Sequence, residues 1–143
     1  MDKVTRLQLQ QRLQNDWQNL VARYQSLSPA RQQAFLNKQG YASFGSLLGH
    51  IIAWWQDGAL HIQEMRADPT LPLKDYDVDA FNARAVEKFS GCSEATMLQT
   101  YEAQRQAMLD LLNSLTDAEL HQSNINTRLY YEIIMHWTEH ELA

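Results

Sequence analysis

Four segments of this chain repeat apolar residues at helical spacing, and capping or helix-breaking residues bound them. The widest apolar stripe runs from Ser43 to about Ala67, where Pro69 prevents the helix from continuing. Comparable helices are predicted from Lys3 to about Leu27, from Ser93 to near Ser114, and from about Thr127 to Leu142. No segment alternates apolar and polar residues as a half-buried strand would. The pattern predicts an all-α four-helix bundle.

The segments between these helices predict two further features. Asp2 is placed to cap the first helix, and Ser28 followed by Pro29 predicts a short connecting helix to about Asn37. A long connection from Asp68 to Ser90 separates the second and third long helices and contains a short helical run, Ala80 to Phe89. A connection of this length either has a function of its own or crosses along the bundle.

Composition limits the classes of function. The 143 residues suit one domain, spanning 1–143, with 45% hydrophobic residues to form its core. The net charge is -5 and the Lys and Arg residues are scattered, which argues against a nucleic-acid partner. Cys92 is the only cysteine, so no intramolecular disulfide can form. The absence of a signal peptide and of a long apolar run predicts a cytoplasmic protein without a membrane partner.

Two histidines in the last helix have the spacing of a metal-binding pair. His136 and His140 lie four residues apart, so they project from one face of a helix about one turn apart. Leu129 and Ile133 place this pair at the border of the buried stripe. Five histidines in a chain of this length would give such a pair in roughly one random shuffle of seven, so polar contacts at the helix edge are an alternative explanation.

A catalytic transition metal needs at least a third protein ligand, and the second long helix offers two candidates. His50 and His61 lie on the same edge of that helix, roughly 16 Å apart along its axis, so one ion cannot bind both. The spacing leaves the choice between them open. Asp57 or Glu132 is placed to orient a ligand histidine through its second ring nitrogen.

Other candidate sites are weaker. Cys92 precedes the third long helix, whose N-terminus could activate a thiol, but it has no basic neighbour in the sequence. Asp75, Asp77 and Asp79 alternate as in a calcium loop, yet the glycine and final glutamate of an EF-hand are missing. No Arg or Lys lies within one turn of His50 or of the His136 pair, which indicates that any substrate is not strongly anionic.

Three segments together resemble a known family. They are Ser43 to Gln63, DVDAFNARAVEKF from Asp77 to Phe89, and YYEIIMHWTEHE from Tyr130 to Glu141. In order and spacing they resemble the DinB/YfiT-like superfamily of metalloenzyme-like bundles, and most of all its ClbS/DfsB branch. The resemblance implies an up-down-down-up bundle with a long crossover between the second and third helices, often as a homodimer. It also implies a metal triad of His50, His136 and His140 that holds nickel or zinc.

The resemblance suggests three hypotheses for function. The first is a metal-dependent hydrolase or thiol transferase acting on a small-molecule substrate, such as a thiol or an electrophile. The second is a ClbS/DfsB-like protective protein that opens an electrophilic small molecule and does not necessarily need metal. The third is a stress-related binding or scaffold protein whose histidines are structural. Retention of metal, and its requirement for activity, would distinguish the three hypotheses.

Overall fold

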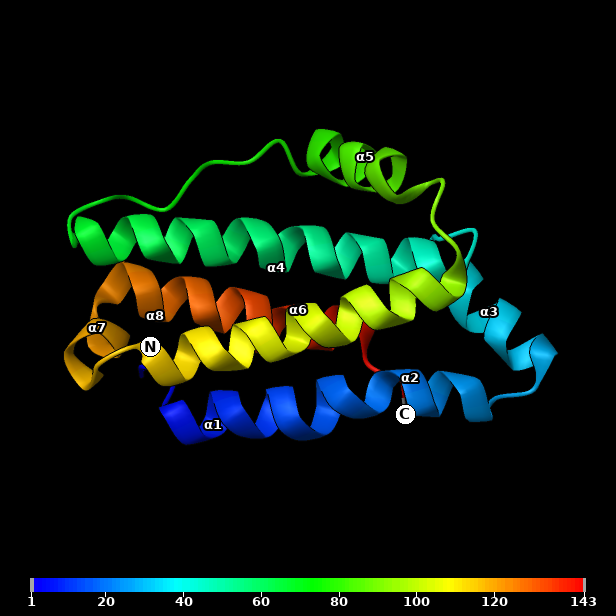
Figure 1. Cartoon of the computed structure of the whole chain (residues 1–143), viewed down its shortest axis with the longest axis horizontal. Helices are drawn as coiled ribbons and strands as arrows, with labels where there is room; N and C mark the ends of the chain where they lie inside the picture. Colours follow the sequence, from blue (N-terminus) through cyan, green and yellow to red (C-terminus); the bar gives the residue numbers. More distant parts are fainter. Residues whose placement is uncertain (1, 143) are drawn as a thin grey trace.

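The computed structural model describes residues 2–142, and no strand occurs among them (Figure 1). Two of the four long helices are uninterrupted, α4 (Phe44–Ala67) and α6 (Glu94–Ser114). The first long helix comprises α1 (Arg6–Gln11), η1 (Arg12–Asp16) and α2 (Trp17–Ser26). The last comprises α8 (Ser123–Leu129), η2 (Tyr130–Met135) and α9 (His136–His140). The predicted all-α class is therefore correct.

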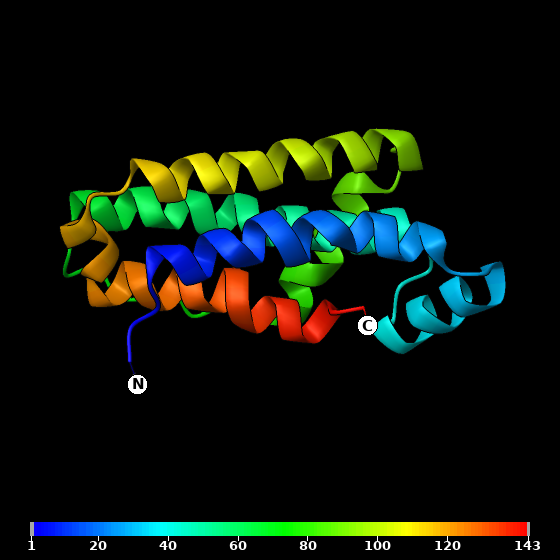
Figure 2. The ribbon, with the colours of Figure 1, turned by 90° about the horizontal axis from the view of Figure 1, so that it is seen from below.

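The long helices form an up-down-down-up bundle. The first and last run in one direction, and α4 and α6 run in the opposite direction (Figures 1 and 2). Because α4 and α6 run the same way, the chain must return along the bundle between them, and α5 (Val78–Phe89) lies on this crossover. Two short helices, α3 (Pro29–Gln39) and α7 (Asp117–His121), complete the connections. No helix within residues 2–142 is long and apolar enough to cross a bilayer.

Local side-chain caps start both α4 and α1, but only the start of α4 was predicted correctly. The Ser43 hydroxyl accepts a hydrogen bond from the N–H of Ser46 and starts α4, as predicted. The predicted start of the first helix was wrong, because Thr5 caps it instead of Asp2. The Thr5 hydroxyl accepts from the N–H of Gln8, and the Gln8 side chain accepts from the N–H of Thr5, so the helix begins at Arg6.

The start of the last helix was also predicted wrongly, four residues too late. Asn124 and Asn126 precede the predicted start at Thr127, but both lie inside α8. The amide of Asn126 bonds to the backbone N–H and carbonyl of Val4 and to the carbonyl of Leu120. The Asn124 amide donates to the carbonyl of Leu71 on the crossover. The Asn126 amide is thus satisfied mainly by Val4, far along the chain, whereas Oδ1 of Asn124 also accepts from the N–H of Ile125 in the first turn of α8. Neither side chain breaks the helix.

Two π-helical turns interrupt helices that were predicted as continuous α-helices. In η1 the N–H of Trp17 donates to the carbonyl of Arg12, five residues back, so the carbonyl of Leu13 loses its usual donor. The guanidinium of Arg105 on α6 donates to this Leu13 carbonyl at 3.0 Å. Arg105 is buried and reaches across from the neighbouring helix. A tertiary hydrogen bond therefore compensates for the wide turn.

The second π turn is also compensated by hydrogen bonds from other helices. In η2 the N–H of His136 donates to the carbonyl of Tyr131, five residues back, and the carbonyl of Glu132 is passed over. The indole N–H of Trp55 on α4 donates to this Glu132 carbonyl at 3.1 Å. The indole N–H of Trp17 donates to the next carbonyl, that of Ile133, at 2.9 Å. Two buried tryptophans thereby hold the π turn that leads directly into His136.

Candidate metal centre

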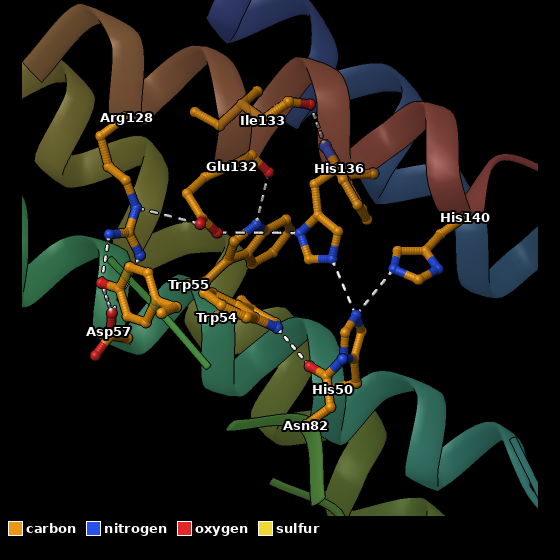
Figure 3. A network of polar contacts seen from close by, with 12 residues as sticks. His50, Trp54, Trp55, Asp57, Asn82, Arg128, Glu132, Ile133, His136 and His140 are labelled. Atoms are coloured by element: carbon orange, nitrogen blue, oxygen red, sulfur yellow. Dashed lines mark hydrogen bonds and ion pairs between the residues drawn. The ribbon is translucent and has the colours of Figure 1, made fainter. Parts of the chain in front are cut away.

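Three histidine side chains converge between α4 and α9 (Figure 3). The Nε2 atom of His50 lies 3.1 Å from Nε2 of His140 and 3.3 Å from Nε2 of His136. One ring nitrogen from each of the three residues lies within 4.8 Å of the other two, and the three side chains are buried. Two nitrogen ligands of a tetrahedral zinc ion, each at about 2.0–2.1 Å from it, are roughly 3.3 Å apart. The separations therefore suit three ligands of one ion.

All three imidazoles are held in the neutral form, which is the form that binds metal. Burial lowers the pKa of His50 to about 4, although the neighbouring amide of Asn82 partly opposes this. Burial, with the nearby His50, lowers the pKa of His140 to about 3. The pKa of His136 lies well below its ordinary value because of burial and then the neighbouring His140 and His50.

Gln39 sets the orientation of one ligand. Its Oε1 atom lies 2.6 Å from Nδ1 of His140. Because a carbonyl oxygen only accepts, this contact assigns the proton of His140 to Nδ1 and leaves a lone pair on Nε2, the atom that faces the other histidines. Gln39 is the last residue of α3, and Gly40 ends that helix in the left-handed region with φ 82°. The segment of α3 was predicted only as a connecting helix, so a role for Gln39 was not predicted.

Glu132 lies next to the second ring nitrogen of His136, as one of the two sequence candidates predicted. Its Oε2 atom is 4.0 Å from Nδ1 of His136 and makes no hydrogen bond, while its Oε1 atom accepts from Nε of Arg128 at 3.2 Å. Burial raises the pKa of Glu132 to about 8, although Arg128 opposes this shift. Gly58 on α4 allows the close packing, because a Cβ atom there would lie 3.1 Å from Cγ of Glu132.

The proposed role of Asp57 in orienting a histidine was wrong, because Asp57 is bound to other groups. Its Oδ2 atom accepts from Nη2 of Arg128 at 3.1 Å and from the hydroxyl of Tyr76. The same guanidinium donates through Nη1 to the Tyr76 hydroxyl at 2.6 Å and to Nδ1 of His61 at 3.0 Å. His61 is therefore an acceptor in the Arg128 cluster, formed by Arg128, Asp57, Tyr76, His61 and Glu132, and it does not join the other histidines.

A cavity of about 340 Å³ opens beside the three histidines. His50 and His136 line it, whereas His140 does not, since Gln39 contacts that ring. The other lining residues come from α4, the crossover, α5 and the last helix: Trp54, Leu73, Lys74, Tyr76, Val78, Asn82, Arg128, Tyr131, Glu132, Met135 and Glu139. Lys74 and Arg128 line the cavity, although neither lies within one turn of a candidate ligand in the sequence. The absence of a nearby cation in the sequence therefore did not predict the charged groups of the cavity wall.

The remaining sequence candidates lie elsewhere. Cys92 is exposed in the turn before α6, and Asp77 caps α5 by accepting from the N–H of Ala80. Within residues 2–142, only the three histidines bring three or more His, Cys, Asp or Glu ligand atoms close enough for one ion. The aspartates of the crossover therefore do not form a calcium site.

Comparison with known proteins identifies the family. The family model described as the DinB superfamily matches residues 12–142 of this chain. No curated protein and no solved structure matches the chain. The match covers nearly the whole bundle, including the three converging histidines, and the helical architecture agrees with it. The chain belongs to the DinB superfamily.

Proposed function

We propose that this protein is a metal-dependent enzyme of the hydrolase or thiol-transferase type. His50, His136 and His140 would hold one divalent ion, nickel or zinc. The observation that carries the proposal is the convergence of three buried, neutral imidazoles on one point at the edge of a cavity. When bound, such an ion acts as a Lewis acid and lowers the pKa of a water or thiol that reaches it.

The surrounding residues indicate from which side a substrate approaches. His140 is contacted by Gln39, and the ring of Tyr41 lies 5.3 Å from that of His50, so α3 and the residue after Gly40 close this side. His50 and His136 line the cavity on the other side. A substrate therefore reaches the site from the cavity, along the face formed by these two histidines.

Glu132 is the acid–base group nearest to the site. Its Oε2 atom makes no hydrogen bond and lies 4.0 Å from Nδ1 of His136, so as a carboxylate it would attract the Nδ1 proton and favour this orientation of the ring. Because burial raises its pKa to about 8, it can also hold a proton at neutral pH. Arg128 fixes the other oxygen, and Asp57 and Tyr76 fix Arg128 in turn. The Arg128 cluster thus positions Glu132 at the wall of the cavity.

The composition of the cavity wall favours metal chemistry over a metal-free protective role. The residues that line the cavity include no Ser, Thr or Cys, and two of its other nucleophilic side chains are bound to neighbours: Lys74 pairs with Glu64, and the Tyr76 hydroxyl contacts Asp57 and Arg128. The exposed Cys92 is not among them. A water or thiol activated at the three histidines would supply a stronger nucleophile than these side chains.

The proposal is tested by elemental analysis of protein purified without a histidine tag. We expect about one nickel or zinc ion per chain in the wild type, lost in His136→Ala and kept in the matched control His121→Ala, which changes an exposed histidine of α7. Circular dichroism shows whether each variant is folded. A wild-type protein that stays metal-free after incubation with both ions would refute the proposal and favour the protective or scaffold hypotheses.

A further inference from the structure

The exposed apolar residues of this protein gather around one cavity. Within residues 2–142, seven large hydrophobic side chains are exposed, and four of them line the cavity beside the histidines: Leu73, Val78, Tyr131 and Met135, at 39%, 52%, 49% and 38% exposure. The other three, Leu7, Leu60 and Val86, are not part of this lining. Apolar side chains gathered at the mouth of a concave site indicate a surface that binds an apolar partner.

The inner walls of the cavity are aromatic and fixed in position. The ring of Trp54 stacks on that of Phe81 at 3.9 Å between centroids, and its indole N–H donates to the Asn82 side chain at 2.8 Å. Tyr76 meets Trp54 edge to face at 5.1 Å. A rigid aromatic wall favours flat or apolar groups that pack against it without losing much conformational entropy.

The cations of the cavity are already paired. Arg128 directs four of its five N–H groups to Glu132, Asp57, Tyr76 and His61. A ligand carboxylate would have to compete with Asp57 and Glu132 for this guanidinium. The other cation, Lys74, lies 3.5 Å from the carboxylate of Glu64.

A carboxylate at the rim adds to this effect. Glu139 also lines the cavity and makes no ion pair within the described part of the chain. Its charge disfavours a second anionic group on a ligand.

We propose that the substrate is a small molecule with an aryl or acyl body and a single metal-binding group. The body would lie between the aromatic wall and the apolar rim, and the metal-binding group would reach His50 and His136. Polyanionic ligands would be excluded because the cavity offers them no unpaired cation. This inference rests on the proposed metal site and adds the class of substrate to it.

Three hydroxamates with the same metal-binding group test the inference. Zinc-loaded protein is titrated calorimetrically with acetohydroxamate, benzohydroxamate and 4-carboxybenzohydroxamate, after the zinc content has been measured. We expect benzohydroxamate to bind at least about tenfold more tightly than acetohydroxamate, because its ring removes apolar surface from water. The added carboxylate should weaken binding at least about threefold, because it lacks an unpaired cation and meets Glu139.

Variants at the rim locate the binding site of the ring. Met135→Gln and Leu73→Gln should each reduce the preference for benzohydroxamate at least about threefold and leave acetohydroxamate unaffected. The matched control Leu7→Gln changes an exposed leucine outside the cavity and should leave the preference intact. Equal binding of the two hydroxamates to protein that retains zinc would overturn the inference but not the proposed function. Unchanged preference in both rim variants would also overturn it, and failure to retain zinc would refute both proposals.

Discussion

Replacing Gln39 with leucine should weaken metal binding without destabilising the fold. In the proposed metal-bound state Nε2 of His140 would be a ligand, so its proton would be on Nδ1, where Gln39 accepts it at 2.6 Å. Leucine has a similar volume but no acceptor. Without metal the imidazole of the leucine variant can carry its proton on Nε2, beside His50, and then has no buried N–H without an acceptor. The loss therefore falls on metal affinity.

The size of the effect follows from the cost of a buried donor without an acceptor. Such a donor costs about 1–3 kcal/mol, which corresponds to roughly 5- to 150-fold in affinity. Competition with a zinc-binding chelator at neutral pH measures this directly. Gln39→Glu, which keeps an acceptor, should bind zinc at least as tightly as the wild type. Gln33→Leu is the matched control, because it removes a 2.8 Å hydrogen bond to Asn37 on the exposed face of the same helix.

Zinc affinity of Gln39→Leu within about twofold of the wild type would refute the reasoning. It would show that the contact between Gln39 and His140 has no influence on the ligand. An equal loss in Gln33→Leu would also refute it, because the effect would then come from α3 as a whole.

Two further predictions concern stability. Gly58→Ala should lower the free energy of unfolding by about 1–3 kcal/mol relative to Gly45→Ala. A Cβ atom at Gly58 would lie 3.1 Å from Cγ of Glu132, whereas at Gly45 the nearest atom is 3.5 Å away. Equal free energies of unfolding in urea for the two variants would contradict this prediction. In metal-free protein, His140 has its pKa lowered to about 3, so below pH about 6.5 the unfolded chain binds a proton that the folded chain does not, and stability falls as the pH falls. Between about pH 6 and 4, His140→Gln should reduce the dependence of the free energy of unfolding on pH by about 1.4 kcal/mol per pH unit. His121→Gln, at an exposed histidine, is the control, and the same pH dependence in both variants would show that His140 does not cause it.

The starts of α4 and α6 were predicted correctly from local caps, whereas the equally local Thr5 cap of α1 was missed. Ser43 caps α4, and Ser93 caps α6 through the N–H of Thr96, because a cap needs only the next three residues. The start of the last helix was missed because Asn126 looks like a helix breaker in sequence. Its amide bonds to Val4, 122 residues away, and no local pattern reports such a partner.

Part of the candidate site could be predicted from the sequence. The i, i+4 spacing of His136 and His140 places both rings on one helical face, and the structure brings them together with His50. Spacing alone could not choose between His50 and His61; that choice came from the family resemblance. The structure gives a physical reason for it, because Arg128 already occupies Nδ1 of His61.

The π turns explain why the rest of the site could not be predicted from local patterns. A regular helix would bond the N–H of His136 to the carbonyl of Glu132, whereas the wide turn frees that carbonyl for Trp55 on α4. Trp55 and His50 belong to the same helix, so this hydrogen bond ties the helix that carries one histidine to the turn that leads into another. The carbonyls of Glu132 and Ile133 in this turn accept from Trp55 on α4 and Trp17 on α2, so donors from two other helices compensate for the wide turn. The relative position of His50 and His136 is therefore a property of the packed bundle, and neither helix specifies it alone.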